Sequence, residues 1–414
     1  MKLINRKLGD GIHIKHGFAF LGEHFSDQGK YVLLTPGNFY EEGGFKFRPE
    51  KDRYYIGTFP SDYLLKKDDL IVAMTEQGPG LLGSSAFIPE GSTYLHNQRL
   101  GLVDEIDKEF FDKKYLYHLF NSRGVRSQIY GSATGTKVRH TSPGRIYKVK
   151  VLVPDVVKQK EISSIIENYS QLIDGNRWRI QLLEEAAQLL FREWFVYFRF
   201  PGHEKVKIID GVPEGWKKEK INRLVTFKRG VEPGSDNYLE TYESGSFPFF
   251  RVSDLVTRNP SIFVDEQYAK NALLKKSDIV ISLDGSVGIV SMGLEGCYST
   301  GIRKLIIKDK KINRSYLYFL MKSHYIQGLI NAYAKGTTIQ HAGEAIKHLN
   351  PILPPQNLMD LFDEITNSAF NEILILLDQN QKLAQARDLL LPRLMSGAIE
   401  VSESNIEISK EVET

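Results

Sequence analysis

Residues 65–71 read LKKDDLI and residues 274–280 read LKKSDIV, so one pattern occurs twice in the chain. Further matches follow in the same order: YLYHL at 115–119 with YLYFL at 316–320, Gly135-Thr136 with Gly336-Thr337, and Val153-Pro154 with Leu353-Pro354. The matches lie about 200 residues apart, far beyond the ~20–50 residues of a solenoid repeat. The sequence therefore predicts two diverged copies of one unit.

The composition fits a globular protein. The chain has 414 residues, a formal net charge of +3 and a single cysteine, Cys297. One cysteine rules out an internal disulfide and fits a reducing compartment, and without a base near it in the sequence we expect it to be a small buried residue. No apolar run approaches the ~20 residues of a membrane span, and the N-terminus lacks the apolar segment of a signal peptide. We expect a cytoplasmic protein without membrane contact.

Each copy begins with short apolar runs and glycine-rich turns and ends in a long helical pattern. The first part predicts an α+β (or α/β-type) domain with one helix, near 110–121 and near 315–323. The predicted segments are a first domain at 1–155, a long helix at 156–200, a linker at 201–212, a second domain at 213–355, a second long helix at 356–397 and an acidic, flexible tail at 398–414. The fold class is therefore a tandem of α+β domains separated by long α-helices, with a pseudo-two-fold internal repeat.

The long helices carry the seam of a coiled coil. Apolar side chains recur at alternating intervals of four and three residues, and most of them recur again 200 residues later. The residues predicted to pack the helices or a partner are Ile162, Ile166, Tyr169, Ile173, Ile180, Leu183, Leu190 and Trp194 in the first helix, and Phe362, Ile373, Leu376, Leu383 and Leu390 in the second. We expect Ile365 to replace Thr366 in this seam. Packing as an antiparallel coiled coil is the simplest explanation.

Polar and flexible positions interrupt the seam. Gly175 predicts a local kink, since glycine within a helix costs about 1 kcal/mol. Asn176 and Asn380 would be costly in a dry seam. They either control the register, face a partner or are solvated.

Positive charge gathers at the same place in each copy. Residues 113–154 and 310–343 contain no aspartate or glutamate. The basic residues of the first span are Lys113, Lys114, Arg123, Arg126, Lys137, Arg139, Arg145, Lys148 and Lys150, with His118 and His140, and those of the second are Lys310, Lys311, Arg314, Lys322 and Lys335, with His324 and His341. Basic side chains displace counterions from phosphates and so favour DNA binding.

Polar loops lie within these basic spans. Arginine, glutamine and threonine are side chains that read base edges. The predicted DNA contacts are Thr136, Lys137, Arg139, His140 and Arg145 in the first copy and Lys335, Thr337, Thr338, Gln340 and His341 in the second. The alternative is a structural Gly-Thr turn that leads into the next strand.

The motifs of catalysis are missing from the sequence. Residues 78–83 match the spacing of a dinucleotide fingerprint, but the segment after them reads as strand and turn, where the fingerprint needs a helix. No P-loop and no Asn/Asp-Pro-Pro-aromatic motif of DNA amino-methyltransferases is found. We therefore predict no catalytic residue, no metal site and no cofactor bound by this chain.

Three segments resemble type I restriction–modification specificity subunits. They are LFREWFVYFRFPG at 190–202, VPEGW at 212–216 and ARDLLLPRLMSG at 386–397. The resemblance spans essentially the whole chain, although no Pro-Glu-Gly-Trp segment precedes the first domain. The domains themselves match weakly, as expected for modules that differ with the target sequence.

The resemblance implies a non-catalytic subunit that selects a bipartite site in double-stranded DNA. Each domain would be a target-recognition domain that reads one half-site, and the paired helices would fix the gap. The resemblance also implies that two methylation subunits dock on the helices, carry S-adenosylmethionine and methylate adenine. Restriction (translocase) subunits that use ATP and Mg²⁺ would join through them. Two alternatives stay open: a stand-alone methyltransferase or nuclease with an unrecognised motif, and a helical assembly scaffold without a role on DNA.

Overall fold

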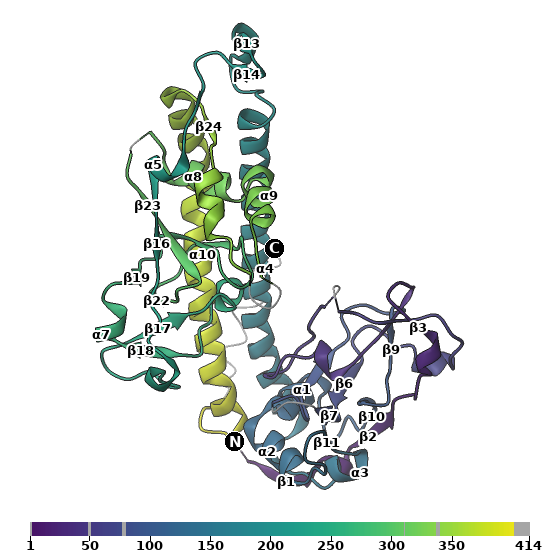
Figure 1. Ribbon diagram of the computed structural model, residues 1–414. Coiled ribbons are helices and arrows are strands. Elements are labelled where there is room, and N and C mark those ends of the chain that lie inside the picture. The colour runs from purple at the N-terminus through teal and green to yellow at the C-terminus, as the bar shows by residue number, and fades with distance from the viewer. Residues whose placement is uncertain (1, 49–50, 77–79, 310, 337–339, 401–414) are drawn as a thin grey trace, which may run out of the picture. The chain divides into compact units, whose positions relative to one another are not determined.

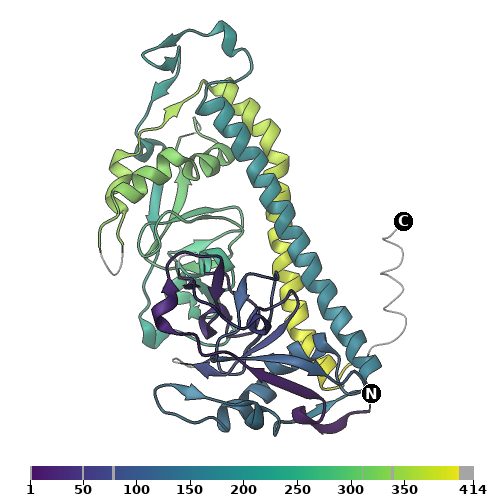
Figure 2. The same ribbon diagram turned by 90° about the vertical axis from the view of Figure 1, so that its right-hand side faces the viewer.

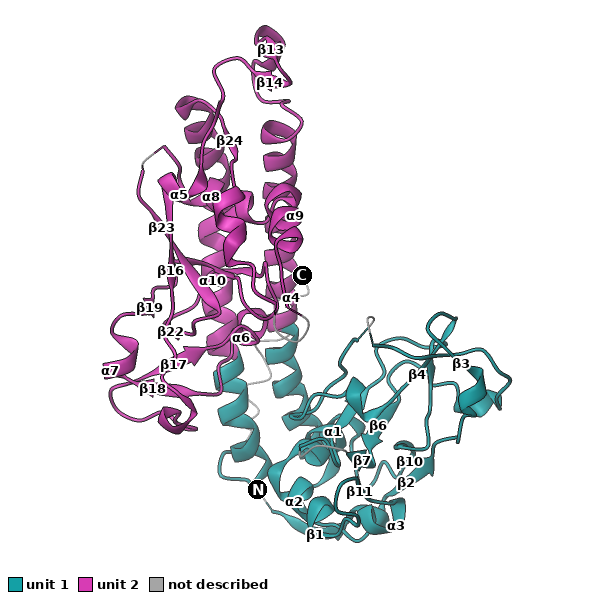
Figure 3. Ribbon diagram, in the orientation of Figure 1, with its two compact units in different colours: residues 1–171, 384–414 teal, residues 172–383 magenta. Residues whose placement is uncertain are grey.

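The computed structural model of the chain describes residues 2–48, 51–76, 80–309, 311–336 and 340–400 (Figure 1). The chain forms two compact units, residues 1–171 with 384–414 and residues 172–383 (Figure 3). Each unit joins one mixed α/β domain to parts of the long helices α4 (Val156–Phe195) and α10 (Gln356–Met395). Of the tail predicted at 398–414, residues 401–414 lie outside the described residues.

The main sheet of unit 1 has the order β2-β10-β6-β8 and is antiparallel throughout. Its strands are β2 (Ile12–His16), β10 (Leu100–Ile106), β6 (Leu70–Ala73) and β8 (Ser85–Phe87). Every residue of β6 is buried, which explains its unbroken apolar run. A second, mixed sheet has the order β3-β5-β4-β9, with strands β3 (Phe25–Ser26), β5 (Tyr54–Tyr55), β4 (Tyr31–Leu33) and β9 (Tyr94–Leu95).

The main sheet of unit 2 has the same order of strands as that of unit 1. Its main sheet runs β16-β23-β20-β21, with strands β16 (Val225–Arg229), β23 (Ile302–Ile307), β20 (Ile279–Ser282) and β21 (Val290–Ser291). Its second sheet runs β18-β17-β22-β19, with strands β18 (Phe263–Asp265), β17 (Ser246–Phe250), β22 (Gly296–Tyr298) and β19 (Leu273–Leu274). The pair β17–β22 is parallel, as is β4–β9 in unit 1. The sequence repeat is thus a repeat of topology in the main sheet, while the second sheets share the parallel pair and differ in their outer strands.

A helix pair follows the main sheet in each unit, where the sequence predicted one helix. The pairs are α1 (Lys113–Asn121) with α2 (Arg123–Gly131), and α8 (Arg314–Met321) with α9 (His324–Ala332). Asp112 and Asn313 cap the first helices by accepting hydrogen bonds from Tyr115 N and Tyr316 N, while Ser122 and Ser323 cap the second ones. These serine caps were the missed signal of a second helix.

The first and last strands of each domain pair with each other. The pairs are β1 (Ile4–Lys7) with β12 (Lys150–Val153), and β15 (Lys217–Lys218) with β24 (Ile352–Leu353). The other short strands are β7 (Thr75–Glu76), β11 (Arg139–His140), β13 (Ile208–Ile209) and β14 (Val212–Pro213). The short helices are α3 (Pro143–Ile146), α5 (Ile221–Leu224), α6 (Asp254–Thr257) and α7 (Glu266–Ala269), and the 3₁₀ turns are η1 (Leu8–Asp10), η2 (Gly22–His24), η3 (Pro36–Asn38), η4 (Ser61–Tyr63), η5 (His203–Lys205), η6 (Ser235–Asn237) and η7 (Gly343–His348).

Helices α4 and α10 lie side by side in both views (Figure 2). Within unit 2 they run antiparallel: Asn176 donates to Asn380 at 3.0 Å, Arg179 pairs with Glu372 at 2.5 Å, and Trp194 meets Phe362 with ring centroids 6.0 Å apart. Helix α4 runs without a break through Gly175. No helix in the described part of the chain is both long and apolar enough to cross a membrane.

Most of the predicted seam is buried. The buried residues are Ile162, Ile166, Ile173, Ile180, Trp194, Phe362, Ile373 and Leu376, and the half-buried ones are Tyr169, Leu183, Leu190, Leu383 and Leu390. The replacement of Thr366 by Ile365 was wrong: Thr366 is buried, while Ile365 is 49% exposed. The Thr366 hydroxyl donates to Phe362 O at 2.8 Å, so its polar atom is satisfied inside the helix and the residue fits the apolar seam.

An aromatic cluster closes one end of the helix pair in unit 2. Trp216 is buried against Phe195, Phe198 and Phe200, with ring centroids 5.2–6.0 Å apart. Phe195 in turn packs on Phe362 of α10. The segments at 190–202 and 212–216, picked out in the sequence as motifs, therefore meet in one core.

We predict that Asn176 and Asn380 stabilise the helix pair together. Changing either one to Leu leaves a half-buried amide without its partner, at a cost of about 1 kcal/mol. N176L and N380L should each lower the thermal midpoint of the helical circular-dichroism signal by about 2–4 °C, and the double variant should recover it. N371L, at an exposed asparagine of α10, is the control. Additive losses in the double variant would contradict the pairing.

We predict a pH-dependent contribution from Asp378, which pairs with Lys276 and so ties the domain of unit 2 to α10. The hydrogen bond from Lys276, with another from Lys382, holds the pKa of Asp378 below its ordinary 3.8. A lowered folded-state pKa stabilises the fold above pH 3.8 and loses this effect as the pH falls through the folded value.

D378N should therefore reduce the free energy of unfolding at neutral pH by no more than ~1 kcal/mol, because the ion pair is so exposed. The thermal midpoint should fall accordingly. The difference from wild type should vanish at the acid end of a pH series. D360N, whose carboxylate accepts a hydrogen bond from the neutral Gln356 side chain, is the control. A difference that persists in acid would refute this assignment.

Candidate nucleic-acid interface

The predicted DNA loop is closed in the same way in both domains. In unit 1, Thr134 N donates to His140 O at 3.0 Å and His140 N donates to Thr134 O at 2.8 Å. In unit 2, Lys335 and His341 exchange the same bonds at 3.1 and 2.8 Å. This pair of bonds fixes the base of each loop.

Glycine at the start of each loop is a structural requirement. Gly135 and Gly336 have φ angles of +95° and +116°, a region that side chains rarely adopt. A Cβ at Gly135 would also lie 2.0 Å from Val138 O. In unit 1 the turn leads into β11, as the structural alternative expected, so the glycine has a structural role while the side chains after it remain available.

Each loop is attached to the end of a central strand of the main sheet. Thr141 N donates to Met74 O at 2.9 Å just past β6, and Ala342 N donates to Leu283 O at 2.7 Å just past β20. β11 pairs with β7, and a matching bridge joins Asp284 to His341. The packed sheet core therefore determines where each loop stands.

The loop of unit 1 presents donors to solvent. The guanidinium of Arg139 lies 4.0 Å from the ring centroid of Tyr130, and no hydrogen bond or ion pair joins it to another described residue. His140 is exposed and its Nδ1 lies 3.2 Å from the Thr75 hydroxyl. Arg145 donates to the Thr134 hydroxyl at 3.4 Å. Thr136 and Lys137 are exposed at the loop tip.

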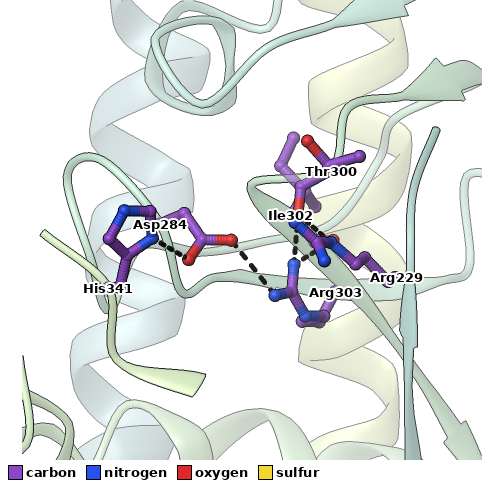
Figure 4. Close-up of polar contacts among 6 residues, drawn as sticks. All are labelled: Arg229, Asp284, Thr300, Ile302, Arg303 and His341. Carbon is purple, nitrogen blue, oxygen red and sulfur yellow. Dashed lines mark hydrogen bonds and ion pairs between the residues drawn. The ribbon is translucent and has the colours of Figure 1, made fainter. Parts of the chain in front are cut away.

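The loop of unit 2 ends on a polar cluster (Figure 4). Asp284 accepts from Arg303 at 3.1 Å through Oδ2 and lies 2.7 Å from His341 Nδ1 through Oδ1. Lys335 and Gln340 are exposed nearby in sequence. The predicted contacts Thr337 and Thr338 lie outside the described residues.

A cleft of about 340 Å³ opens beside this cluster. Arg229 and Arg251 line it together with Asp284 and His341, and Arg229 donates to Thr300 O at 3.3 Å. The DNA contacts predicted from the sequence did not include Arg229, Arg251, Arg303 and Asp284. Aligning the copies strand by strand would have found Asp284, because it stands where Thr75 stands in unit 1.

Several basic residues of the acid-free spans are not available to DNA. Burial lowers the pKa of His118 to about 4, so it is neutral at pH 7. Arg126 donates to the carbonyl oxygens of Leu82, Glu41 and Gly80, and burial lowers its pKa. Lys114 pairs with Glu167 on α4.

The second span behaves alike. Lys322 pairs with Glu184 on α4, and the guanidinium of Arg314 lies over the Phe370 ring on α10. Lys114, Lys322 and Arg314 therefore hold the domains to the long helices. The exposed donors described above lie in the loops. Lys310 lies outside the described residues.

The remaining chemistry-bearing residues behave as the sequence indicated. Cys297 is buried, and burial raises its pKa to about 11, which keeps it a thiol. β8 follows the glycine-rich segment where a dinucleotide fingerprint would need a helix, while Gly78 lies outside the described residues. The donor-rich loops can neutralise phosphates and bind base edges.

Several known proteins are similar to this chain in sequence. The family model described as the type I restriction modification DNA specificity domain matches residues 3–185 and 213–360. The MjaIX specificity subunit of a type I restriction enzyme from Methanocaldococcus jannaschii is 24% identical over 317 residues, which cover 73% of each chain. The HindI specificity subunit from Haemophilus influenzae is 24% identical over 317 residues, covering 60% of this chain and 68% of that protein.

A solved structure supports the same fold. The type I restriction–modification S subunit of M. genitalium superposes with a TM-score of 0.55 at 15% identity, covering 97% of both chains. The family model spans well over half of the present chain. The chain therefore belongs to the family of type I restriction–modification specificity subunits, which supply DNA recognition to their complexes and not catalysis.

Proposed function

We propose that this chain selects a bipartite DNA site, with each domain acting as a target-recognition domain for one half-site. The observation that carries the proposal is the loop that is closed by the same backbone bonds, at the end of the same strand, in both domains. Because the two loops have the same backbone attachment, the two domains can contact DNA in the same way. The side chains on the frames differ, so the half-sites should differ.

Each loop offers a different set of hydrogen-bonding groups. Unit 1 carries Arg139, whose fork of donors suits guanine O6 and N7. Unit 2 carries Gln340, whose amide suits adenine N6 and N7. Lys137, Arg145 and Lys335 add phosphate contacts that do not depend on sequence. Thr136, Thr337 and Thr338 are further contacts that we propose from the sequence alone.

We propose further that α4 and α10 form an antiparallel coiled coil that acts as a spacer. A helix of 40 residues is about 60 Å long. A pseudo-two-fold arrangement of the domains would place the half-sites about one duplex turn, ~34 Å, apart. The repeated topology and the antiparallel contacts in unit 2 support this proposal.

The partners that we propose are two methylation subunits, docked on the helices, and restriction subunits joined through them. S-adenosylmethionine, ATP and Mg²⁺ would then belong to the partners, and the complex would act on DNA in the cytoplasm. The seam side chains are turned inward, so a partner needs other residues. Trp178, Leu182 and Leu189 share one face of α4 and are 43–64% exposed, more apolar surface than a solvated helix face requires.

A scaffold without a role on DNA remains the competing function. A salt titration of duplex binding by the chain assembled with its methylation subunits separates the two. Binding should weaken steeply as salt rises, because phosphate contacts release counterions. Binding that ignores both salt and sequence would favour the scaffold.

We predict that R139A and Q340A each damage one half-site. Each loses contacts worth about 1–3 kcal/mol to a base, so each should weaken binding to its own half-site roughly 5- to 100-fold and relax its sequence. The measurement is binding of the assembled complex to duplexes altered in one half at a time. R192A and Q381A, at exposed positions on α4 and α10, are the matched controls. Equal damage to both halves would show that the loops were wrongly assigned.

We predict that W178E and L182E weaken docking of the methylation subunits. Burying a charge at an apolar contact costs about 2 kcal/mol or more, so affinity by calorimetry should fall at least about 30-fold. Both side chains are exposed, so circular dichroism should be unchanged. V256E, at an equally exposed apolar position in the domain of unit 2, should bind normally. Normal docking by both α4 variants would exclude this face.

A further inference from the structure

The histidine that closes each loop meets a different partner in each domain. Thr75 pairs with His140 across β7 and β11, and Asp284 pairs with His341 at the equivalent bridge. The ring of His140 therefore contacts a hydroxyl, while that of His341 contacts a carboxylate.

The carboxylate of Asp284 is held in place from behind. Arg303 reaches Asp284 Oδ2 at 3.1 Å and also donates to the carbonyl oxygens of Thr300 and Ile302. The side chains of Arg303 and Asp284 are only 11% and 17% exposed, whereas that of His341 is 64% exposed. The ion pair is thus sheltered, and the imidazole stands at the surface beside the cleft (Figure 4).

This arrangement determines which nitrogen of His341 carries the proton. An ionised carboxylate only accepts hydrogen bonds, so Nδ1 of the ring must donate to Asp284. In the neutral ring, Nε2 is then left without a proton and can only accept. The bases that offer a donor in the major groove are adenine, through N6, and cytosine, through N4.

We propose that His341 reads an amino-bearing base, adenine or cytosine, and that Asp284 and Arg303 are positioning residues that select this reading. The inference rests on the proposed function, since it assumes that the loop of unit 2 contacts base edges. It adds the class of base and the residues that determine it.

The first domain lacks this device. The Thr75 hydroxyl can donate or accept, so it leaves the proton of His140 on either nitrogen. Gly101 pairs with Val72 where Arg303 pairs with Ile281, so no arginine stands at the position that would fix a carboxylate. The selection therefore belongs to one half-site only.

D284N is the sharpest test, because the new side chain has the shape of the old one but moves the proton of the His341 ring to the other nitrogen. Arg303 only donates, so it must take the amide oxygen of the new side chain. The amide nitrogen then faces His341 and donates to Nδ1, which moves the ring proton to Nε2. The histidine becomes a donor and should prefer the keto bases guanine and thymine.

The measurement is selection from randomised duplexes by the full chain assembled with its methylation subunits, at a mildly alkaline pH of about 8.5, which favours the neutral form of an imidazole. Wild type should prefer adenine or cytosine at one position of one half-site. D284N should shift that position toward guanine or thymine by roughly 3- to 10-fold, the effect of one hydrogen bond. All other positions should be unchanged.

The controls separate the possible outcomes. H341A should abolish the preference at the same position, and D284N should then add nothing in the double variant. T75V, the matched change in the first domain, should leave that position alone. An unchanged preference in D284N, uniform weakening on all sequences, or a keto preference in wild type would each overturn the inference while specific binding persists. Wild type without any sequence preference would instead refute the proposed function.

Discussion

Burial of apolar side chains between α4 and α10 stabilises each of the two units. In unit 2, Ile180, Trp194, Phe362 and Ile373 are buried in one core with the domain's helices, while in unit 1 Ile162 and Ile166 share a core with Leu394. Each such side chain contributes about 1.5–3 kcal/mol on burial, against which the Asn176–Asn380 pair is a small term. Unit 1 is built from both ends of the chain. Its core is therefore complete only once the last turns of α10 are in place, and the helix seam couples the folding of the first domain to the end of the chain.

The loops depend on this core through a short chain of contacts. Close packing places β6 and β20, the backbone bonds after these strands hold Thr141 and Ala342, and the loop base follows at His140 and His341. The exposed side chains that present donors do not contribute to the core. Arg139 alone among those discussed packs on a ring, that of Tyr130. A rigid base with exposed side chains keeps the entropic cost of ordering the contact small. Lys114, Arg314 and Lys322 instead contact the long helices, which is why net charge along the sequence overstated the charge available to DNA.

The sequence was informative where the physics is local or periodic. A seam at intervals of four and three residues has one apolar face whatever surrounds it, so α4 and α10 were predictable nearly to their ends. Thr366 was misjudged because a threonine can satisfy its hydroxyl within the helix, which hydrophobicity alone does not reveal. The helices α2 and α9 were missed since each begins directly at a serine cap after α1 or α8. Arg303 and Arg229 come from strands far apart in the chain, and Asp284 comes from the segment just past β20. Only the strand pairing brings them together with His341, so no local pattern could identify them.

The pairing of the first and last strands has a consequence for how such chains change. In unit 2 β15 meets β24, so the two points where this domain joins the rest of the chain lie side by side, and in unit 1 β1 meets β12, the strand that leads into α4. A domain whose ends adjoin can be exchanged for another at the same two junctions without altering the helices. Recombination at these junctions would replace one module and leave the frame intact. The architecture thus allows one domain to be exchanged while the helices stay the same.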